Sequence, residues 1–354
     1  MSNNNLEEAK RQIEICNACR FCEGYCAVFP AMTKSKTFNI ADMTQLANLC
    51  HNCQGCYHAC QYTAPHEFNL NLPAVLADVR TESWERMSTP QSVAKIIQGY
   101  GGATAGVLIV ALSLFFLWSR NTEQALNFYS YFSHETLVLI FMPLFIFPFF
   151  AIIFSLKKYW KEVEGEKIKI THLHSALKSV ATLSNLSGGQ GQGCNYEETD
   201  RFSNKRRWLH QSVMYGFLLC FASTSVATIM HYIFDVKAPY PFFSLPKLLG
   251  IPGGVMLTVG CLGLMWLKNK ADKNLSSAKR WGGDWAFLMV LMLTGLSGLM
   301  LFAATGSLYL ELILCFHLAS VATLFLLTPY SKMVHGFFRL SALIRDAQLN
   351  GKAH

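Results

Sequence analysis

The sequence predicts an all-α protein in which a polar N-terminal region precedes a bundle of six membrane-spanning helices. Charged residues make up only 15% of the 354 residues and hydrophobic residues make up 52%, whereas soluble domains carry about 25% charged residues. Two dense groups of cysteines lie within the first sixty residues, and six apolar runs follow residue 98. We therefore expect one domain at residues 1–98, a membrane bundle at 99–335 with a loop at about 157–209, and a tail at 336–354.

The N-terminal region repeats one cysteine pattern, C-x2-C-x2-C-x3-C. Three closely spaced thiolates can bind three irons of one [4Fe–4S] cluster, and in two-cluster ferredoxins the last cysteine of the other run supplies the fourth ligand. The pattern therefore predicts two clusters with crossed ligands. The first cluster takes Cys16, Cys19, Cys22 and Cys60, and the second takes Cys50, Cys53, Cys56 and Cys26.

Disulfides and zinc are the competing interpretations of these cysteines. Disulfides are disfavoured on the cytoplasmic side of a membrane, where thiols stay reduced. Structural zinc sites usually show two CxxC pairs that lie farther apart. Here the third and fourth cysteines of each run follow the pair immediately, so the pattern favours iron–sulfur clusters.

The residues that flank the cysteines predict helices. In bacterial ferredoxins a proline directly follows the fourth cysteine. Here no proline does so, and Pro30 and Pro65 come four and five residues after the fourth cysteines of the two runs. Residues 40–49 carry apolar residues at helical spacing after a possible cap at Asn39, and residues 71–87 have Pro73 near the first turn. We expect an α-helical ferredoxin-like domain, similar to those in subunits of succinate dehydrogenase and heterodisulfide reductase.

Six apolar runs approach or exceed the roughly 20 residues that cross the hydrocarbon core of a bilayer. The core of a globular protein can produce one such run, but not six. The fourth run is the shortest. The runs cover residues 102–119, 136–156, 211–234, 253–267, 285–304 and 308–329.

Basic residues predict the orientation of these spans. If both ends of the chain lie on one side, the basic residues of the loops on that side include a set of fourteen, and the opposite loops carry Arg120, Lys237 and Lys247. The positive-inside rule then places both termini and the cysteines in the cytoplasm. Topology thus explains the net charge of +8 without a nucleic-acid partner. The fourteen residues are Lys157, Lys158, Lys161, Lys167, Lys169, Arg201, Lys205, Arg206, Arg207, Lys268, Lys270, Lys273, Lys279 and Arg280.

Histidines at the ends of the third and sixth spans predict haem. Ionisable residues within spans are rare and usually functional. His210 and His231 bracket the third span, and His317 and His335 lie 18 residues apart, which is five helical turns or about 27 Å. The two spans run in opposite directions, so His231 and His317 would form an outer pair and His210 and His335 an inner pair.

The histidine pairs predict a cytochrome b-like bundle that holds one or two b-type haems. Pro329 interrupts the helical phase before His335. The alternative for each histidine is a position among the lipid headgroups. For His134, at the outer start of the second span, we expect an interfacial or quinone-adjacent position.

The loop before the third span contains a glycine cluster around Cys194, "GGQGQGCNY". It lacks the GxGxxG order and the strand–helix context of a dinucleotide site. Two interpretations stay open: a flexible turn, and a lid or docking loop near the inner haem.

Several segments together carry a resemblance to a known family. "CRFCEGYCAVFPAM", "CQYTAPHEF", "GGQGQGCNY", "GFLLCFASTSVATIMHY" and "PYSKMVHGFFR" make the chain similar to the tricarballylate (citrate) utilization protein B family over essentially its full length. The resemblance implies a bacterial inner-membrane electron carrier with [4Fe–4S] clusters and haem. Its partner would be the FAD-dependent tricarballylate dehydrogenase, and the eight cysteines above occupy the family's cluster positions.

We therefore expect an electron-transfer subunit of a membrane oxidoreductase. Electrons would pass from the reduced flavin of the partner through two clusters and haem to membrane quinone. Substrate chemistry would belong to the partner, since no flavin or nicotinamide motif is present here. The alternatives are a membrane-anchored iron–sulfur redox sensor or anchor without haem conduction, and a transporter, which the near-terminal positions of Asp235, Asp284 and Glu311 disfavour.

Overall fold

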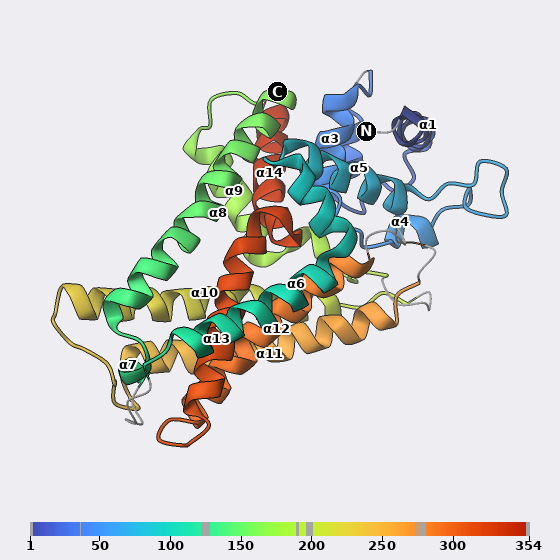
Figure 1. Ribbon diagram of the computed structural model, residues 1–354. Coiled ribbons are helices and arrows are strands. Elements are labelled where there is room, and N and C mark those ends of the chain that lie inside the picture. The colour runs from blue at the N-terminus through green and yellow to red at the C-terminus, as the bar shows by residue number, and fades with distance from the viewer. Residues whose placement is uncertain are drawn as a thin grey trace.

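The computed structural model confirms the all-α fold class (Figure 1). It describes residues 3–35, 37–121, 128–188, 191–195, 201–272, 275 and 281–351. Over these ranges the chain forms helices joined by turns, and the only β pairing is an isolated antiparallel bridge between Cys194 and Ser203. Lys273, Lys279 and Arg280, which the sequence analysis counts among the basic loop residues, lie outside the described residues.

Helices carry, connect and flank the cysteines of the N-terminal region. The Asn39 side chain caps the third helix by accepting a hydrogen bond from the Asp42 backbone N–H, and the Asp42 carboxylate accepts one from the Asn39 N–H. Pro73 lies in the first turn of the fifth helix, where its missing N–H costs no hydrogen bond. These helices are α1 (Asn3–Cys19), α2 (Val28–Met32), α3 (Ile40–Leu49), α4 (Gly55–His58) and α5 (Leu72–Met87).

Six helices are long and apolar enough to cross a membrane, as the sequence predicts. The fourth of them is longer than its apolar run, because Pro246 opens it and Pro252 lies within it. The six are α6 (Gln91–Ser119), α8 (His134–Glu162), α10 (Lys205–Tyr232), α11 (Leu245–Asn269), α12 (Trp281–Ala303) and α13 (Leu310–Leu327). A short helix, α7 (Phe128–Tyr131), precedes α8.

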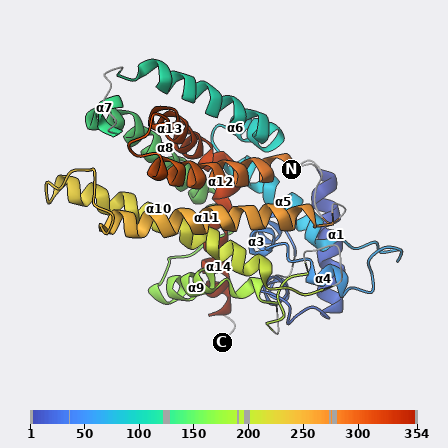
Figure 2. The same ribbon diagram turned by 90° about the horizontal axis from the view of Figure 1, so that it is seen from below.

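Helices α10 and α11 run side by side through small residues (Figure 2). A Cβ atom added at Gly216 would lie 2.6 Å from the backbone nitrogen of Leu257, and one added at Gly253 would lie 2.9 Å from that of Cys220. The two backbones therefore approach more closely than any larger residue allows. Helices α6, α12 and α13 pack together beside α11.

Residues 335–350, near the C-terminus, form a helix that packs onto the N-terminal core. This helix, α14 (His335–Asn350), packs against α3, α8 and α9 (Ile170–Thr182) at the end of the bundle that carries both termini (Figure 1). Phe338 and Ile344 are buried with Ile13 and Met32 of the cysteine region. Residues 98 and 99, the expected domain boundary, lie inside α6, next to a break in helical geometry at Tyr100.

Polar contacts join the N-terminal domain to the end of α8. Glu162 accepts hydrogen bonds from Arg86 of α5, at 2.6 Å for the Nη2–Oε1 contact, and from Thr44 of α3 at 2.8 Å. Tyr159 donates to Gln45 at 2.6 Å, and Gln45 donates to the carbonyl of Ala342 in α14 at 2.8 Å. The cysteine region therefore rests directly on one end of the bundle.

Candidate redox centre

The first candidate site is a cavity of about 150 Å³ in the N-terminal domain. Cys16 and Cys19 come from the last turn of α1, Cys22 follows in a turn, and Cys60 comes from the segment after α4. Cys56 also lines this cavity, and the remaining lining residues carry no charged side chain. Three cysteines of the first run therefore share a cavity with the fourth cysteine of the second run.

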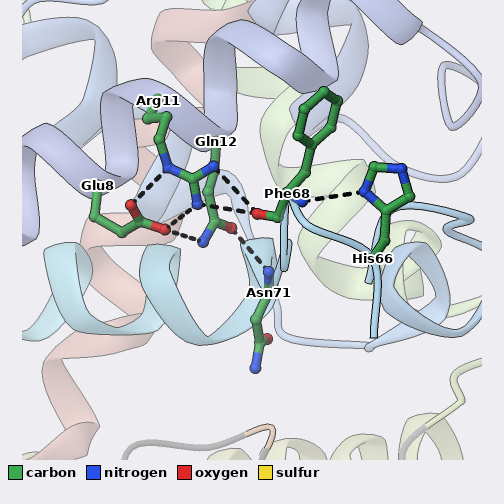
Figure 3. A network of polar contacts seen from close by, with 6 residues as sticks. All are labelled: Glu8, Arg11, Gln12, His66, Phe68 and Asn71. Atoms are coloured by element: carbon green, nitrogen blue, oxygen red, sulfur yellow. Dashed lines mark hydrogen bonds and ion pairs between the residues drawn. The ribbon is translucent and has the colours of Figure 1, made fainter. Parts of the chain in front are cut away.

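A polar network fixes the segment after Cys60 against α1 (Figure 3). Arg11 donates to the carbonyl of Phe68 at 3.1 Å and to Glu8, whose Oε1 lies 2.6 Å from Arg11 Nη2. Gln12 accepts from the N–H of Asn71 at 3.0 Å. These contacts place Cys60 beside the cysteines at the end of α1.

The second candidate site is a smaller cavity of about 20 Å³, lined by Cys26, Cys50, Cys53 and Cys56. Cys56 lines both cavities, and so do Phe29, Leu72 and Pro73. The two cavities therefore adjoin. The first brings together three cysteines of the first run with Cys56 and Cys60, and the second brings together three cysteines of the second run with Cys26.

Several backbone N–H groups are directed at cysteine sulfurs. The N–H of Asn52 donates to Cys50 Sγ and that of Tyr62 donates to Cys60 Sγ, both at 3.4 Å. Cys26 accepts from the N–H groups of Val28 and Phe29. Hydrogen bonds to sulfur are among the features that set the potentials of iron–sulfur centres.

Burial raises the pKa of the free thiols. It is the main reason that the pKa of Cys16 rises to about 12, and the neighbouring Cys60, Cys22 and Cys19 raise it further. Burial, followed by Cys60, Cys19 and Cys53, also raises the pKa of Cys22 to about 12. Protons would leave these thiols only when a metal replaces them.

The thiols around the two cavities form a donor set that iron–sulfur clusters use. Among the described residues, no three His, Cys, Asp or Glu side chains converge closely enough to hold one metal ion. Thiols instead surround each cavity, and four thiolates are the donor set of a [4Fe–4S] cluster.

Three arginines surround the backbone of the second cysteine run. Arg80 of α5 and Arg339 of α14 both donate to the carbonyl of Cys50, the latter at 2.5 Å. Arg206 of α10 donates to the carbonyls of Asn52 at 2.7 Å and His51 at 3.1 Å. Burial, then Arg80, lowers the pKa of Arg339 to about 10, and Cys50 acts in the opposite direction.

The glycine-rich loop lies against the second cysteine run. The N–H of Asn195 donates to the carbonyl of Cys53 at 3.0 Å, and the buried Cys194 thiol lies within hydrogen-bonding reach of Cys53. Cys194 also bonds to the carbonyl of Leu186 at 3.4 Å and pairs with Ser203 through the backbone. The described part of this loop therefore contacts Cys53, which lines the second cysteine cavity.

The inner histidine pair is brought together. The rings of His210 in α10 and His335 in α14 have centroids 5.8 Å apart and lie at 89° to each other. His335 Nδ1 lies 2.5 Å from the carbonyl of Lys332, which fixes this nitrogen as the donor and leaves Nε2 as the acceptor. His210 Nδ1 is buried without a hydrogen-bond partner.

The two histidines predicted as an outer pair have different neighbours in the structure. His231 stacks on His134, with ring centroids 3.9 Å apart and planes 24° apart. His134 also bonds to Tyr232 at 3.0 Å. His317 instead lies 2.9 Å from Ser297 Oγ through Nδ1 and packs against Gly298.

The two pairs of neighbouring histidines differ in how well their geometry suits two ligands of one haem iron. Metal–imidazole bonds are about 2 Å long, so two axial ligands place their nitrogens about 4 Å apart with lone pairs directed at the same point. The inner pair has a centroid separation compatible with this requirement, and a backbone carbonyl orients one ring, as is usual for ligating histidines. In the His134–His231 stack the ring planes are nearly parallel, so the lone pairs lie side by side.

Comparison with known proteins assigns the chain to a family. Residues 94–354 match the family described as Citrate utilization protein B, and residues 9–85 match the Citrate utilization protein B Fer4-like domain. The chain belongs to the citrate utilization protein B family. Citrate utilization protein B of Escherichia coli is 40% identical over 347 residues, which cover 96% of this chain and 91% of the relative. No solved structure matches the chain.

Membership in the citrate utilization protein B family confirms the resemblance that the sequence motifs indicate. The Fer4-like match covers both cysteine runs, and the six long apolar helices fit a multi-pass membrane protein.

The sequence analysis did not predict that arginines bind the second cysteine run, or that Cys194 lies beside Cys53. One signal was available. Arg206 precedes His210 by four residues and Arg339 follows His335 by four, so each arginine lies one turn, or about 6 Å, from a histidine that is itself notable.

Proposed function

We propose that this chain is an electron-transfer subunit that oxidises the reduced flavin of a tricarballylate dehydrogenase-like partner and delivers the electrons to membrane quinone. The first cluster would be held by Cys16, Cys19, Cys22 and Cys60, the second by Cys50, Cys53, Cys56 and Cys26, and b-type haem by histidines of the bundle. When bound, these groups supply one-electron redox chemistry. The chain would thereby support tricarballylate or citrate utilisation.

One observation carries the proposal: arginines link the second of two adjoining cysteine cavities to a pair of half-buried histidines. Cys56 lines both cavities. Arg206 and Arg339 each bind the second cysteine run and lie one helical turn from His210 and His335. Sites for three redox groups would therefore follow one another from the N-terminal domain into the bundle.

His210 and His335 are our proposed ligands for haem at the inner side. His231 and His317 remain candidates for a second haem, which would require their helices to present both rings to it. His231 would first have to leave its stack on His134. We propose the bacterial inner membrane as the location, with the cysteine domain in the cytoplasm as the positive-inside rule predicts.

The proposal is tested by purifying the protein anaerobically and measuring iron, sulfide and haem. We expect about eight irons and eight sulfides per chain, as two [4Fe–4S] clusters require, together with a b-type α-band after reduction by dithionite. A zinc-loaded protein without labile sulfide would contradict the proposal. Cys220→Ala is the matched control, because Cys220 lies in α10 outside both cysteine cavities.

A further inference from the structure

The two cysteine cavities differ in their electrostatic surroundings. Neither cavity is lined by a lysine, arginine, aspartate or glutamate side chain, so the difference lies in the charged groups just outside the linings. Around the second, three guanidinium groups bind the carbonyls of Cys50, His51 and Asn52. These guanidiniums come from α5, α10 and α14, which lie far apart in the sequence.

Such a concentration of positive charge requires compensation. Among the described residues, neither Arg80 nor Arg339 forms an ion pair with a carboxylate, and the Nε of Arg339 is buried without a hydrogen-bond partner. Like charges that are held together in a partly buried site are unfavourable unless a negative charge lies nearby. A [4Fe–4S] cluster with four thiolate ligands is anionic, and it becomes more so on reduction.

We propose that Arg80, Arg206 and Arg339 raise the reduction potential of the cluster held by the second cysteine cavity above that of the cluster in the first. The inference rests on the proposed function, and it adds a direction to it. One electron leaves the centre in the first cavity, which is oxidised, and enters the centre in the second, which is reduced. No bond and no proton changes in this step.

The proposed direction of electron transfer, from the first centre to the second, agrees with the positions of the arginines. Arg206 and Arg339 lie between the second cysteine run and the inner histidines, one turn along α10 and α14. The side chain of Phe21, beside the first cavity, is 68% exposed, and Cys19 is also exposed. The first cavity is thus nearer to solvent and to any soluble donor, and the second is nearer to the membrane bundle.

The experiment is a redox titration of the full-length protein, followed by the electron paramagnetic resonance of the reduced clusters. The signal that Cys53→Ser removes identifies the second cluster. In the wild type we expect this signal at the higher potential. In Arg339→Gln and in Arg80→Gln we expect it to shift to a lower potential while the other signal stays unchanged.

Two control variants separate charge from structure. Arg339→Lys keeps the charge and should retain the wild-type potential, whereas a purely structural role would make it resemble Arg339→Gln. Arg20→Gln removes an exposed positive charge near the first cysteine run, and it should leave the second signal in place.

The inference is overturned if the second signal titrates below the first, or if neither glutamine variant shifts it at wild-type iron content. Should Arg339→Gln lose its iron, Arg80→Gln alone decides. Absence of both signals from the wild type would instead refute the proposed function, so the two failures are distinguishable.

Discussion

The two cysteine cavities share one motif but have different surroundings. The first combines three cysteines of the first run with Cys56 and Cys60, and the second combines three cysteines of the second run with Cys26. Beside the first, Arg11 and Gln12 of α1 bind the segment at Phe68 and Asn71. Beside the second, residues from α10, α14 and the glycine-rich loop bind the cysteine run, although they lie more than 130 positions later in the sequence.

This difference shows that the motif sets the ligand positions but not the electrostatics of the centre. The surroundings of the first cavity belong to the N-terminal domain, so that domain can define the first site by itself. The second cavity is complete only when the membrane bundle and the C-terminal helix have packed against the cysteine region. Changes in the bundle should therefore affect the second centre more than the first.

The largest expected effect is the loss of a whole cluster. Cys19→Ser should remove the first cluster and Cys53→Ser the second, and each should lower the iron content by about half because each removes one of four thiolate ligands. Iron analysis and electron paramagnetic resonance would measure this. Loss of the same signal in both variants would contradict the assignment of Cys19 and Cys53 to separate clusters.

Loss of haem is expected next, and only from the inner pair. His210→Ala and His335→Ala should each abolish the α-band of the inner haem, because each would remove one of its two proposed ligands. His134→Ala, which removes a stacking partner of His231, is the control and should keep the band. An α-band of undiminished intensity in both inner-pair variants would exclude these residues as ligands.

A smaller effect is expected from Cys194→Ala, which removes the thiol beside Cys53. The second cluster should lose a hydrogen bond near its ligand, and its potential should fall while the first cluster remains unchanged. Cys194→Ser keeps a donor at this position and should behave like the wild type. A shift confined to the first cluster would contradict the placement of the loop.

The smallest effect should come from the network around the first cavity. Arg11→Ala should lower the stability of the segment after Cys60 by about 1 kcal/mol or less, because its ion pair with Glu8 is exposed. The expected readout is faster loss of iron from the first cluster to a chelator. A preferential loss from the second cluster would contradict this prediction.

The stabilisation that the Arg11–Glu8 ion pair provides should depend on pH. The hydrogen bond from Arg11 lowers the pKa of Glu8 below its unfolded value of 4.5. Its contribution is therefore present above that value and is lost as the pH falls through the lower pKa of the folded state. In Glu8→Gln, the rate at which the first cluster loses iron to a chelator should no longer show this part of its dependence on acid pH.

The sequence was sufficient to predict the elements that depend on local signals. The spans follow from apolar runs, and the cap at Asn39 and the start of α5 follow from single residues. The role of α14 did not follow, because its contacts involve distant partners such as Gln45, which donates a hydrogen bond to the carbonyl of Ala342 from 297 residues away. The neighbour of His231 was also not predictable, since helical spacing fixes the height of a residue in the bilayer but not which helix lies beside it.

Whether electrons reach the bundle through the second cysteine cavity can be measured directly. Reduced tricarballylate dehydrogenase would be mixed rapidly with Cys53→Ser that retains its haem, and the haem α-band would be followed over time. We predict that the wild type shows rapid haem reduction and that the variant shows none. Haem reduction at the wild-type rate in the variant would contradict the proposed relay.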